Sequence, residues 1–162
     1  MASSDYLLEL DGIKGESAQK GFEGQIEIQS WSFGVTQLGS SSQGTGAGSG
    51  KASFQDIHFT TSASKASPNL FMACATGKHI PKAVLHMRKA GGKQEEYYTV
   101  TLTDVLVSSF QLGGHDSAGA LPTDQFAFNF SKIELAYKSQ KADGSLDAAI
   151  KAGYDLKKGT KV

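Results

Sequence analysis

The chain has 162 residues and 39% of them are hydrophobic, which is the size and apolar content of one domain with its own core. Its 16 basic and 16 acidic residues balance, which argues against a nucleic-acid-binding surface and leaves self-association unopposed. One cysteine, Cys74, excludes an intrachain disulfide framework, and no segment approaches the ~20 apolar residues of a membrane-spanning helix.

The N-terminal segment, MASSDYLLELDGIKGES, has neither a basic region nor an apolar run long enough for a signal peptide. We therefore expect a chain that is made as a soluble cytoplasmic protein and does not insert into a membrane. If it is exported, we expect a route that needs no N-terminal signal.

Residues 25–36 alternate like a strand, but the alternation changes phase in the middle. Ile26 and Ile28 mark one face, whereas the apolar residues from Trp31 onward have the opposite parity. Such a change predicts a β-bulge near 29–30, or a strand that crosses from one sheet to another.

A long aromatic strand predicted at 124–139 repeats this change of phase. Its apolar residues are even-numbered up to Phe130 and odd-numbered from Ile133, which makes 131–132 a second candidate bulge. Two bent strands of this kind suit the corners of a barrel or of two packed sheets. Further strands are expected at 6–10, 52–60, 82–89, 95–112 and 153–157.

One helix is expected, within residues 65–80. Ser67 is a suitable N-cap, Pro68 fits the first helical position, and Gly77 provides a left-handed C-terminal stop. A helix of about ten residues is marginal alone in water, so it must pack on the strands. The side chains that we expect in the core are Trp31, Phe33, Leu70, Phe71, Cys74 and Phe128.

The Gly/Ser-rich segment 39–50 is too polar to pack in a core and too long for a tight hairpin. It superficially resembles a phosphate-binding loop. Counting back from Lys51, however, places Thr45 where the first glycine belongs, and Ala52 replaces the hydroxyl ligand. We therefore do not expect a nucleotide or another cofactor here.

No catalytic or metal-binding pattern is present among the four histidines and the scattered acidic residues. Asp56 and His58 share one strand face, and we interpret them as a structural hydrogen-bonded pair rather than as metal ligands or an acid–base pair. The alternating aromatic residues favour a buried sheet face over a stacking platform for sugars or bases. The protein is not expected to be an enzyme.

Seven segments of the chain form a recognisable series: DGIKGES (11–17), SWSFGV (30–35), FQDIHFT (54–60), KASPNLFMACATGKHI (65–80), RKAGG (88–92), DVLVSS (104–109) and QKADGS (140–145). In this order and with this spacing they resemble the haemolysin-coregulated protein family, the tube proteins of the type VI secretion system of Gram-negative bacteria. The resemblance extends from about Asp5 to Ser145, while residues 146–162 match loosely and are expected to add one short strand and then fray.

This resemblance implies a mainly β, single-domain protein of 162 residues, built as a two-sheet β-barrel with one flanking α-helix. It further implies homohexameric rings that stack into a hollow tube. A contractile sheath expels the tube together with a spike protein, and small secreted effectors can travel in the pore. The protein would be cytoplasmic before assembly and extracellular, with a role in virulence, afterwards.

Two assembly surfaces are expected on this basis. Small polar residues opposite the core face of the second strand are the candidates for the pore wall, namely Ser30, Ser32 and Thr36. The Gly/Ser-rich segment is the candidate for contact with a neighbouring ring, through Gly39, Ser40, Ser41, Gly44, Gly46, Gly48, Gly50 and Lys51. Two alternatives stay open: a monomeric β-sandwich that binds a carbohydrate or another ligand, and an enzyme based on Asp56 and His58.

Overall fold

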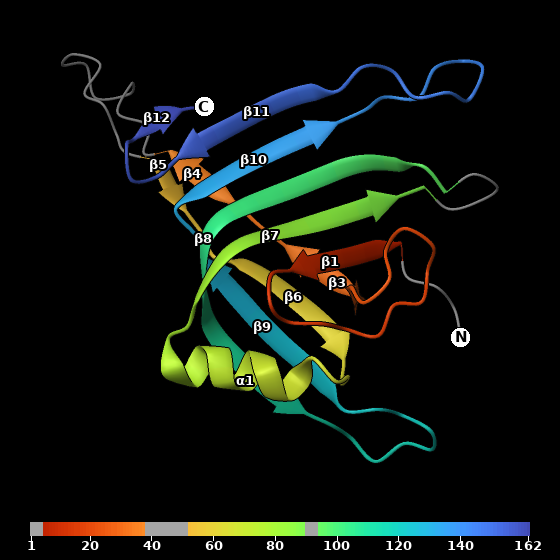
Figure 1. Cartoon of the computed structure of the whole chain (residues 1–162), viewed down its shortest axis with the longest axis vertical. Helices are drawn as coiled ribbons and strands as arrows, with labels where there is room; N and C mark the ends of the chain where they lie inside the picture. Colours follow the sequence, from red (N-terminus) through yellow and green to blue (C-terminus); the bar gives the residue numbers. More distant parts are fainter. Residues whose placement is uncertain (1–4, 38–51, 90–93) are drawn as a thin grey trace.

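The computed structural model describes residues 5–37, 52–89 and 94–162. The fold is mainly β with one helix, as predicted (Figure 1). The helix α1 (Ser67–Thr76) lies between β6 and β7, and the strands are β1 (Tyr6–Leu10), β2 (Ile26–Ile28), β3 (Ser30–Ser32), β4 (Val35–Gln37), β5 (Ala52–Phe54), β6 (Ile57–Ser62), β7 (His79–Arg88), β8 (Glu96–Gly113), β9 (Thr123–Asn129), β10 (Lys132–Tyr137), β11 (Ile150–Asp155) and β12 (Thr160–Lys161).

The long strand β8 joins two layers of one sheet. Its first part pairs with β7 and β10 in a layer ordered β12-β11-β10-β8-β7-β1-β2. From Leu106 onward β8 pairs with β9, which begins a second layer ordered β8-β9-β6-β3. Figure 1 shows β8 curving from one set of strands into the other, with α1 lying across the lower end.

Both predicted changes of phase are crossings between these layers. β2 pairs with β1 in the first layer, β3 pairs with β6 in the second, and Gln29 between them donates its backbone N–H to Thr60 O at 2.9 Å. β9 likewise pairs in the second layer and β10 in the first, with the backbone N–H of Ser131 bonded to Thr103 O at 3.0 Å. The parity changes because the buried side of the chain changes when it enters the other layer.

The sheet does not close into the barrel that the resemblance implied, because β2 at the end of the first layer and β3 at the end of the second do not pair with each other. The predicted fraying of the tail is also wrong, because β11 and β12 extend the first layer beyond β10. β11 pairs with β10 along all six of its residues, and β12 pairs with β11 through Thr160 and Lys161. The expected strand 52–60 is divided at Gln55 and Asp56 into β5 and β6.

The core lies between the two layers. Phe59, Phe126 and Phe128 form its aromatic centre, with ring centroids 5.1 to 5.4 Å apart. Of the six expected core residues, Leu70 and Phe128 are fully buried, whereas three pack only partly buried against the core. These three are Trp31, Phe33 and Cys74.

Phe71 was also expected in the core, and that prediction is wrong. Its side chain is 54% exposed and touches Phe110 of β8, with ring centroids 6.3 Å apart. The short helix buries only Leu70 and Ala73, and Phe71 lies about 100° further round the helix from Leu70. The buried face of α1 is therefore narrower than the set of apolar helical residues predicted for the core.

The ends of α1 agree only in part with the prediction. Gly77 has the expected left-handed conformation, with φ of 66°, and ends the helix. Ser67 is not the N-cap, because the cap is Ala66 and makes no side-chain cap hydrogen bond. Ser67 instead donates its hydroxyl to the buried carboxylate of Asp124 and accepts the backbone N–H of Ser64 at 3.0 Å.

Candidate assembly surfaces

The outward face of the second layer is polar and carries no acidic, lysine or arginine side chain in its two central rows. Cross-strand pairing places these side chains side by side, because directly opposite residues in antiparallel strands point to the same face. One row is Ser30, Thr60, Gln125 and Gln111, and the other is Ser32, His58, Ala127 and Ser109. We refer to these eight residues as the polar face; seven of them are polar, and the eighth, Ala127, is 1% exposed.

Strand alternation and one bulge produce this face. In β6, Ile57, Phe59 and Thr61 point into the core, so His58 and Thr60 point outward. In β8 the register shifts between Val107 and Ser109, which oppose Phe128 and Ala127 respectively. This bulge reverses the alternation of the following residues, so Phe110 points inward and Gln111 points outward.

Two of the three residues predicted for the pore wall belong to the polar face. Ser30 and Ser32 are exposed and alternate with the partly buried Trp31, as the parity argument required. Thr36 is also exposed, but it lies on β4, which pairs with β5 in a separate two-stranded sheet. The chain leaves the second layer at Phe33 and Gly34, so the strand parity of Ser32 does not extend to Thr36.

The predicted hydrogen-bonded pair of Asp56 and His58 is wrong. Asp56 instead accepts hydrogen bonds from Ser108 Oγ at 2.6 Å and from Asn129 Nδ2 at 3.0 Å. Both carboxylate oxygens are thus held by neighbours at the margin of the polar face. His58 stands in the second row without this carboxylate, so the two residues do not form an acid–base pair.

A serine, a histidine and an aspartate also meet where β8 bends, but not in the order that activates a nucleophile. His79 Nε2 lies 3.0 Å from Asp104 Oδ1, and Ser131 donates its hydroxyl to Asp104 Oδ2 at 2.9 Å. The hydrogen bonds of His79 and Ser131 lower the pKa of Asp104. Ser131 bonds the carboxylate rather than the imidazole, so these three side chains do not form the serine–histidine–aspartate sequence of hydrogen bonds that activates a serine. Within residues 5–37, 52–89 and 94–162, no group of three or more His, Cys, Asp or Glu side chains could hold a metal ion.

The β4–β5 hairpin flanks the segment predicted to contact a neighbouring ring. Residues 38–51, which include all eight loop candidates from Gly39 to Lys51, lie outside the described residues. The hairpin itself is mostly exposed, and Val35 is 51% exposed. Contacts among Phe33, Phe54 and Tyr154 attach it to the rest of the protein.

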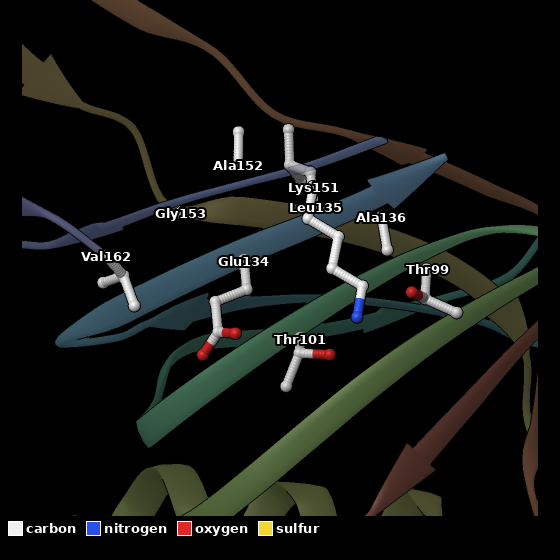
Figure 2. A pocket seen from close by; sticks show the side chains of 9 residues that line it. All are labelled: Thr99, Thr101, Glu134, Leu135, Ala136, Lys151, Ala152, Gly153 and Val162. Atoms are coloured by element: carbon white, nitrogen blue, oxygen red, sulfur yellow. The ribbon is translucent and has the colours of Figure 1, made fainter. Parts of the chain in front are cut away.

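A shallow groove of about 350 Å³ lies on the first layer, across β8, β10 and β11. Figure 2 shows Lys151 extending from β11 toward Thr99 and Thr101 of β8, with Glu134 beside Thr101. The Glu134 carboxylate is paired with Lys132 Nζ at 3.1 Å. The sequence did not indicate this groove, because the tail that forms one wall was expected to fray.

Helix α1 presents an uncharged surface with two large exposed apolar side chains. Phe71 is 54% exposed and Met72 is 53% exposed, and the ten helical residues, SPNLFMACAT, include no charged side chain. Exposed apolar surface of this kind is typical of protein–protein contacts. Within the part of the chain that the structure describes, no helix is long and apolar enough to cross a membrane.

Comparisons with known proteins agree on one family. Residues 7–137 match the family model described as "Type VI secretion system effector, Hcp". The curated protein hcp1 of Pseudomonas aeruginosa is 41% identical over 155 residues, which cover 94% of this chain and 95% of that protein.

Solved structures of similar proteins have the same fold. Hcp1 from Salmonella typhimurium is 33% identical, covers 99% of this chain and 100% of its own, and has a TM-score of 0.81. A structure described as a type six secretion system protein has a TM-score of 0.93 at 25% identity, with 99% and 100% coverage. A type VI secretion system effector from Yersinia pestis is 32% identical, with a TM-score of 0.76 and coverage of 93% and 99%. The chain therefore belongs to the Hcp family of type VI secretion tube proteins.

Proposed function

We propose that six copies of this chain form a ring, that the polar face lines its pore, and that the rings stack into the hollow tube of a type VI secretion system. The polar face is the observation that carries this proposal. A pore wall must be wetted without binding its contents tightly, and uncharged hydroxyl and amide side chains provide such a surface. Ser30 and Ser32 are the pore-facing residues that the structure supports best.

The ring requires a heterologous contact, in which one patch of each subunit meets a different patch of the next. The uncharged surface of α1, with Phe71 and Met72, is our candidate for one of these patches. The large exposed apolar fraction of both side chains supports this assignment. Thr36 belongs in this proposal to the hairpin rather than to the pore wall.

Stacking is assigned to the β4–β5 hairpin and to the Gly/Ser-rich segment 39–50 between its strands. All three residues of β4 and Ser53 of β5 are exposed, which supports the assignment. In this proposal the partners of the assembled tube are the spike protein at its tip, the contractile sheath around it and small secreted effectors in its pore.

The chain acts in this proposal as one structural domain without catalytic activity. It is cytoplasmic before assembly and is then secreted with the tube. The arrangement of Asp56 and of Ser131 with His79 supports a structural role, because neither contains the hydrogen bond between a histidine and a serine hydroxyl that activates the serine of a catalytic triad.

The mass of the purified protein in solution tests the proposal. Six copies of the 17.1 kDa chain weigh about 103 kDa by light scattering, and negative-stain images of the same fraction should show rings with a hollow centre. A monomer at micromolar concentration would contradict the ring. A ligand-dependent rise in melting temperature of that monomer would then favour a β-sandwich binding module.

A further inference from the structure

The β4–β5 hairpin lacks the support that the other strands give one another. β4 and β5 pair with each other through Val35, Thr36 and Gln37, and neither pairs with another strand among the described residues. An isolated two-stranded hairpin is marginally stable in water. Its position must therefore depend on side-chain contacts with the rest of the protein.

The hairpin is joined to the second layer at a narrow base. The backbone N–H of Gln55 bonds Gly34 O at 2.9 Å, and a Cβ atom at position 34 would lie 3.0 Å from Gln55 Oε1. Beyond this base, Phe33 touches Phe130 with ring centroids 6.0 Å apart and Phe54 with centroids 6.5 Å apart. These contacts fix where the hairpin starts.

The C-terminal strand β11 provides a further and closer contact. The ring of Tyr154 stacks on Phe54 with centroids 5.1 Å apart and an interplanar angle of 26°. Tyr154 is itself held by β-pairing, because it lies opposite the buried Ile133 of β10 and opposite Lys161 of β12. Figure 1 shows β4 and β5 next to β11 and β12 at the same end of the molecule.

We propose that Tyr154 acts as a positioning residue that holds the β4–β5 hairpin in one orientation by stacking on Phe54. The C-terminal hairpin β11–β12 then has a definite role, which is to support this contact. The consequence for ring stacking rests on the proposed function, since the direction of the hairpin decides what the segment between β4 and β5 can reach. The contact itself is a property of the single chain.

Hydrogen–deuterium exchange of the hairpin amides at 35–37 and 52–54 tests this proposal in the full chain. An aromatic pair of this kind corresponds to about a two- to tenfold change in the opening equilibrium, so Tyr154→Ala should exchange these amides about two- to tenfold faster. Tyr154→Phe keeps the ring and should exchange like the unmodified protein. Phe54→Ala also removes the contact with Phe33, so it should accelerate exchange at least as much as Tyr154→Ala. Adding Tyr154→Ala to Phe54→Ala should add little, because the stacking contact is already absent.

Tyr137→Ala is the matched control. Tyr137 lies on the neighbouring strand β10 and contacts Tyr97 and Tyr98, at 6.2 and 5.3 Å between ring centroids, rather than the hairpin. It should leave hairpin exchange unchanged, and the β6 amides at 57–62 should stay protected in every variant, which shows that the core is folded. Unchanged hairpin exchange in Tyr154→Ala, or equal acceleration in Tyr137→Ala, would overturn the proposal.

The exchange experiment needs no ring, so the proposed tube function can fail without affecting its result. Where rings and stacks do form, Tyr154→Ala should leave the ring mass unchanged and shorten the stacks seen by negative stain. Stacks of normal length in a variant with accelerated hairpin exchange would overturn the link to stacking.

Discussion

His86 lies between carboxylates from two other strands, and its closer partner is Glu96. The Nδ1 atom of His86 is 3.0 Å from Glu96 Oε2, and its Nε2 atom is 3.2 Å from Glu9 Oε1. The side chain of His86 is only 15% exposed, and Phe22 packs edge-on against it at 5.4 Å between ring centroids. Burial lowers the pKa of His86, but the hydrogen bonds and charges of Glu96 and Glu9 outweigh burial and raise the pKa above its usual value.

We expect the protein to lose stability as pH rises through the pKa of His86 in the folded state. A raised pKa in the folded state contributes stability that is fully present below the unfolded value of about 6.5 and disappears above the folded value. His86→Gln should lower the free energy of unfolding by about 1 kcal/mol near pH 6 and remove this pH dependence. Urea unfolding across a pH series measures both effects, with the exposed His115→Gln as control. An unchanged pH dependence in His86→Gln would contradict the assignment.

Substitution of two neighbouring residues of α1 should change the free energy of unfolding by very different amounts. Leu70 is fully buried, so Leu70→Ala should lower the free energy of unfolding by about 2–5 kcal/mol. This value refers to the dissociated chain, which is a single subunit outside the ring. Phe71→Ser should cost less than about 1 kcal/mol there, because more than half of that side chain is already exposed. Denaturant unfolding measures both values.

Ring formation, in contrast to stability, should be impaired by Phe71→Ser. If α1 provides a ring contact, Phe71→Ser lowers the mass of the particle in light scattering although the chain remains folded. A dissociated chain destabilised as strongly by Phe71→Ser as by Leu70→Ala would show that Phe71 belongs to the core after all.

Gly153 in β11 is required because its neighbours approach it closely. A Cβ atom at this position would lie 2.9 Å from Glu134 Cγ, 3.2 Å from Ile133 O and 3.3 Å from Val162 Cβ. Gly153→Val should therefore destabilise the protein by about 1–3 kcal/mol in urea unfolding. The adjacent, exposed Ala152→Val is the control and should be nearly neutral. Equal effects of the two substitutions would contradict a tightly packed C-terminal strand.

A bulky residue in the Gly/Ser-rich segment should impair stacking without affecting the ring. Gly48→Trp is expected to leave the mass of the particle unchanged in light scattering and to reduce the number of stacked rings seen by negative stain. The segment cannot be part of the core of its own chain, because its composition is too polar to pack there. Lys141→Trp, on an exposed turn, serves as the control. Normal stacking of Gly48→Trp would remove the segment from the stacking contact.

Strand periodicity located the two crossings between layers, although it did not distinguish a crossing from a β-bulge. The parity changes after Ile28 and after Phe130 are visible in the sequence because each side of the crossing buries the opposite face. The same reasoning placed Ser30 and Ser32 opposite Trp31. The alternation of buried and exposed side chains along a strand involves residues that are close in sequence, so it can be recognised in a single sequence.

The features that the sequence did not predict depend on contacts between distant segments. Ser67 bonds Asp124 of β9 instead of capping its own helix, although its type and position suit a cap. Thr36 lies outside the second layer because β3 ends at Ser32, and the next residue, Phe33, contacts Phe54 and Phe130 from distant parts of the chain. Tyr154 stacks on Phe54, which lies one hundred residues earlier in the chain, and no local sequence pattern predicts this contact.

The position of Ser32 in an assembled ring tests most directly that the polar face lines the pore. We would replace Cys74 by serine, introduce a single cysteine as Ser32→Cys, and label it with maleimide-coupled gold. Lys151→Cys, in the groove on the opposite layer, is the matched control (Figure 2). End-on images should show gold from Ser32→Cys in the centre of the ring and gold from Lys151→Cys at its periphery. Gold from Ser32→Cys at the periphery would contradict the account.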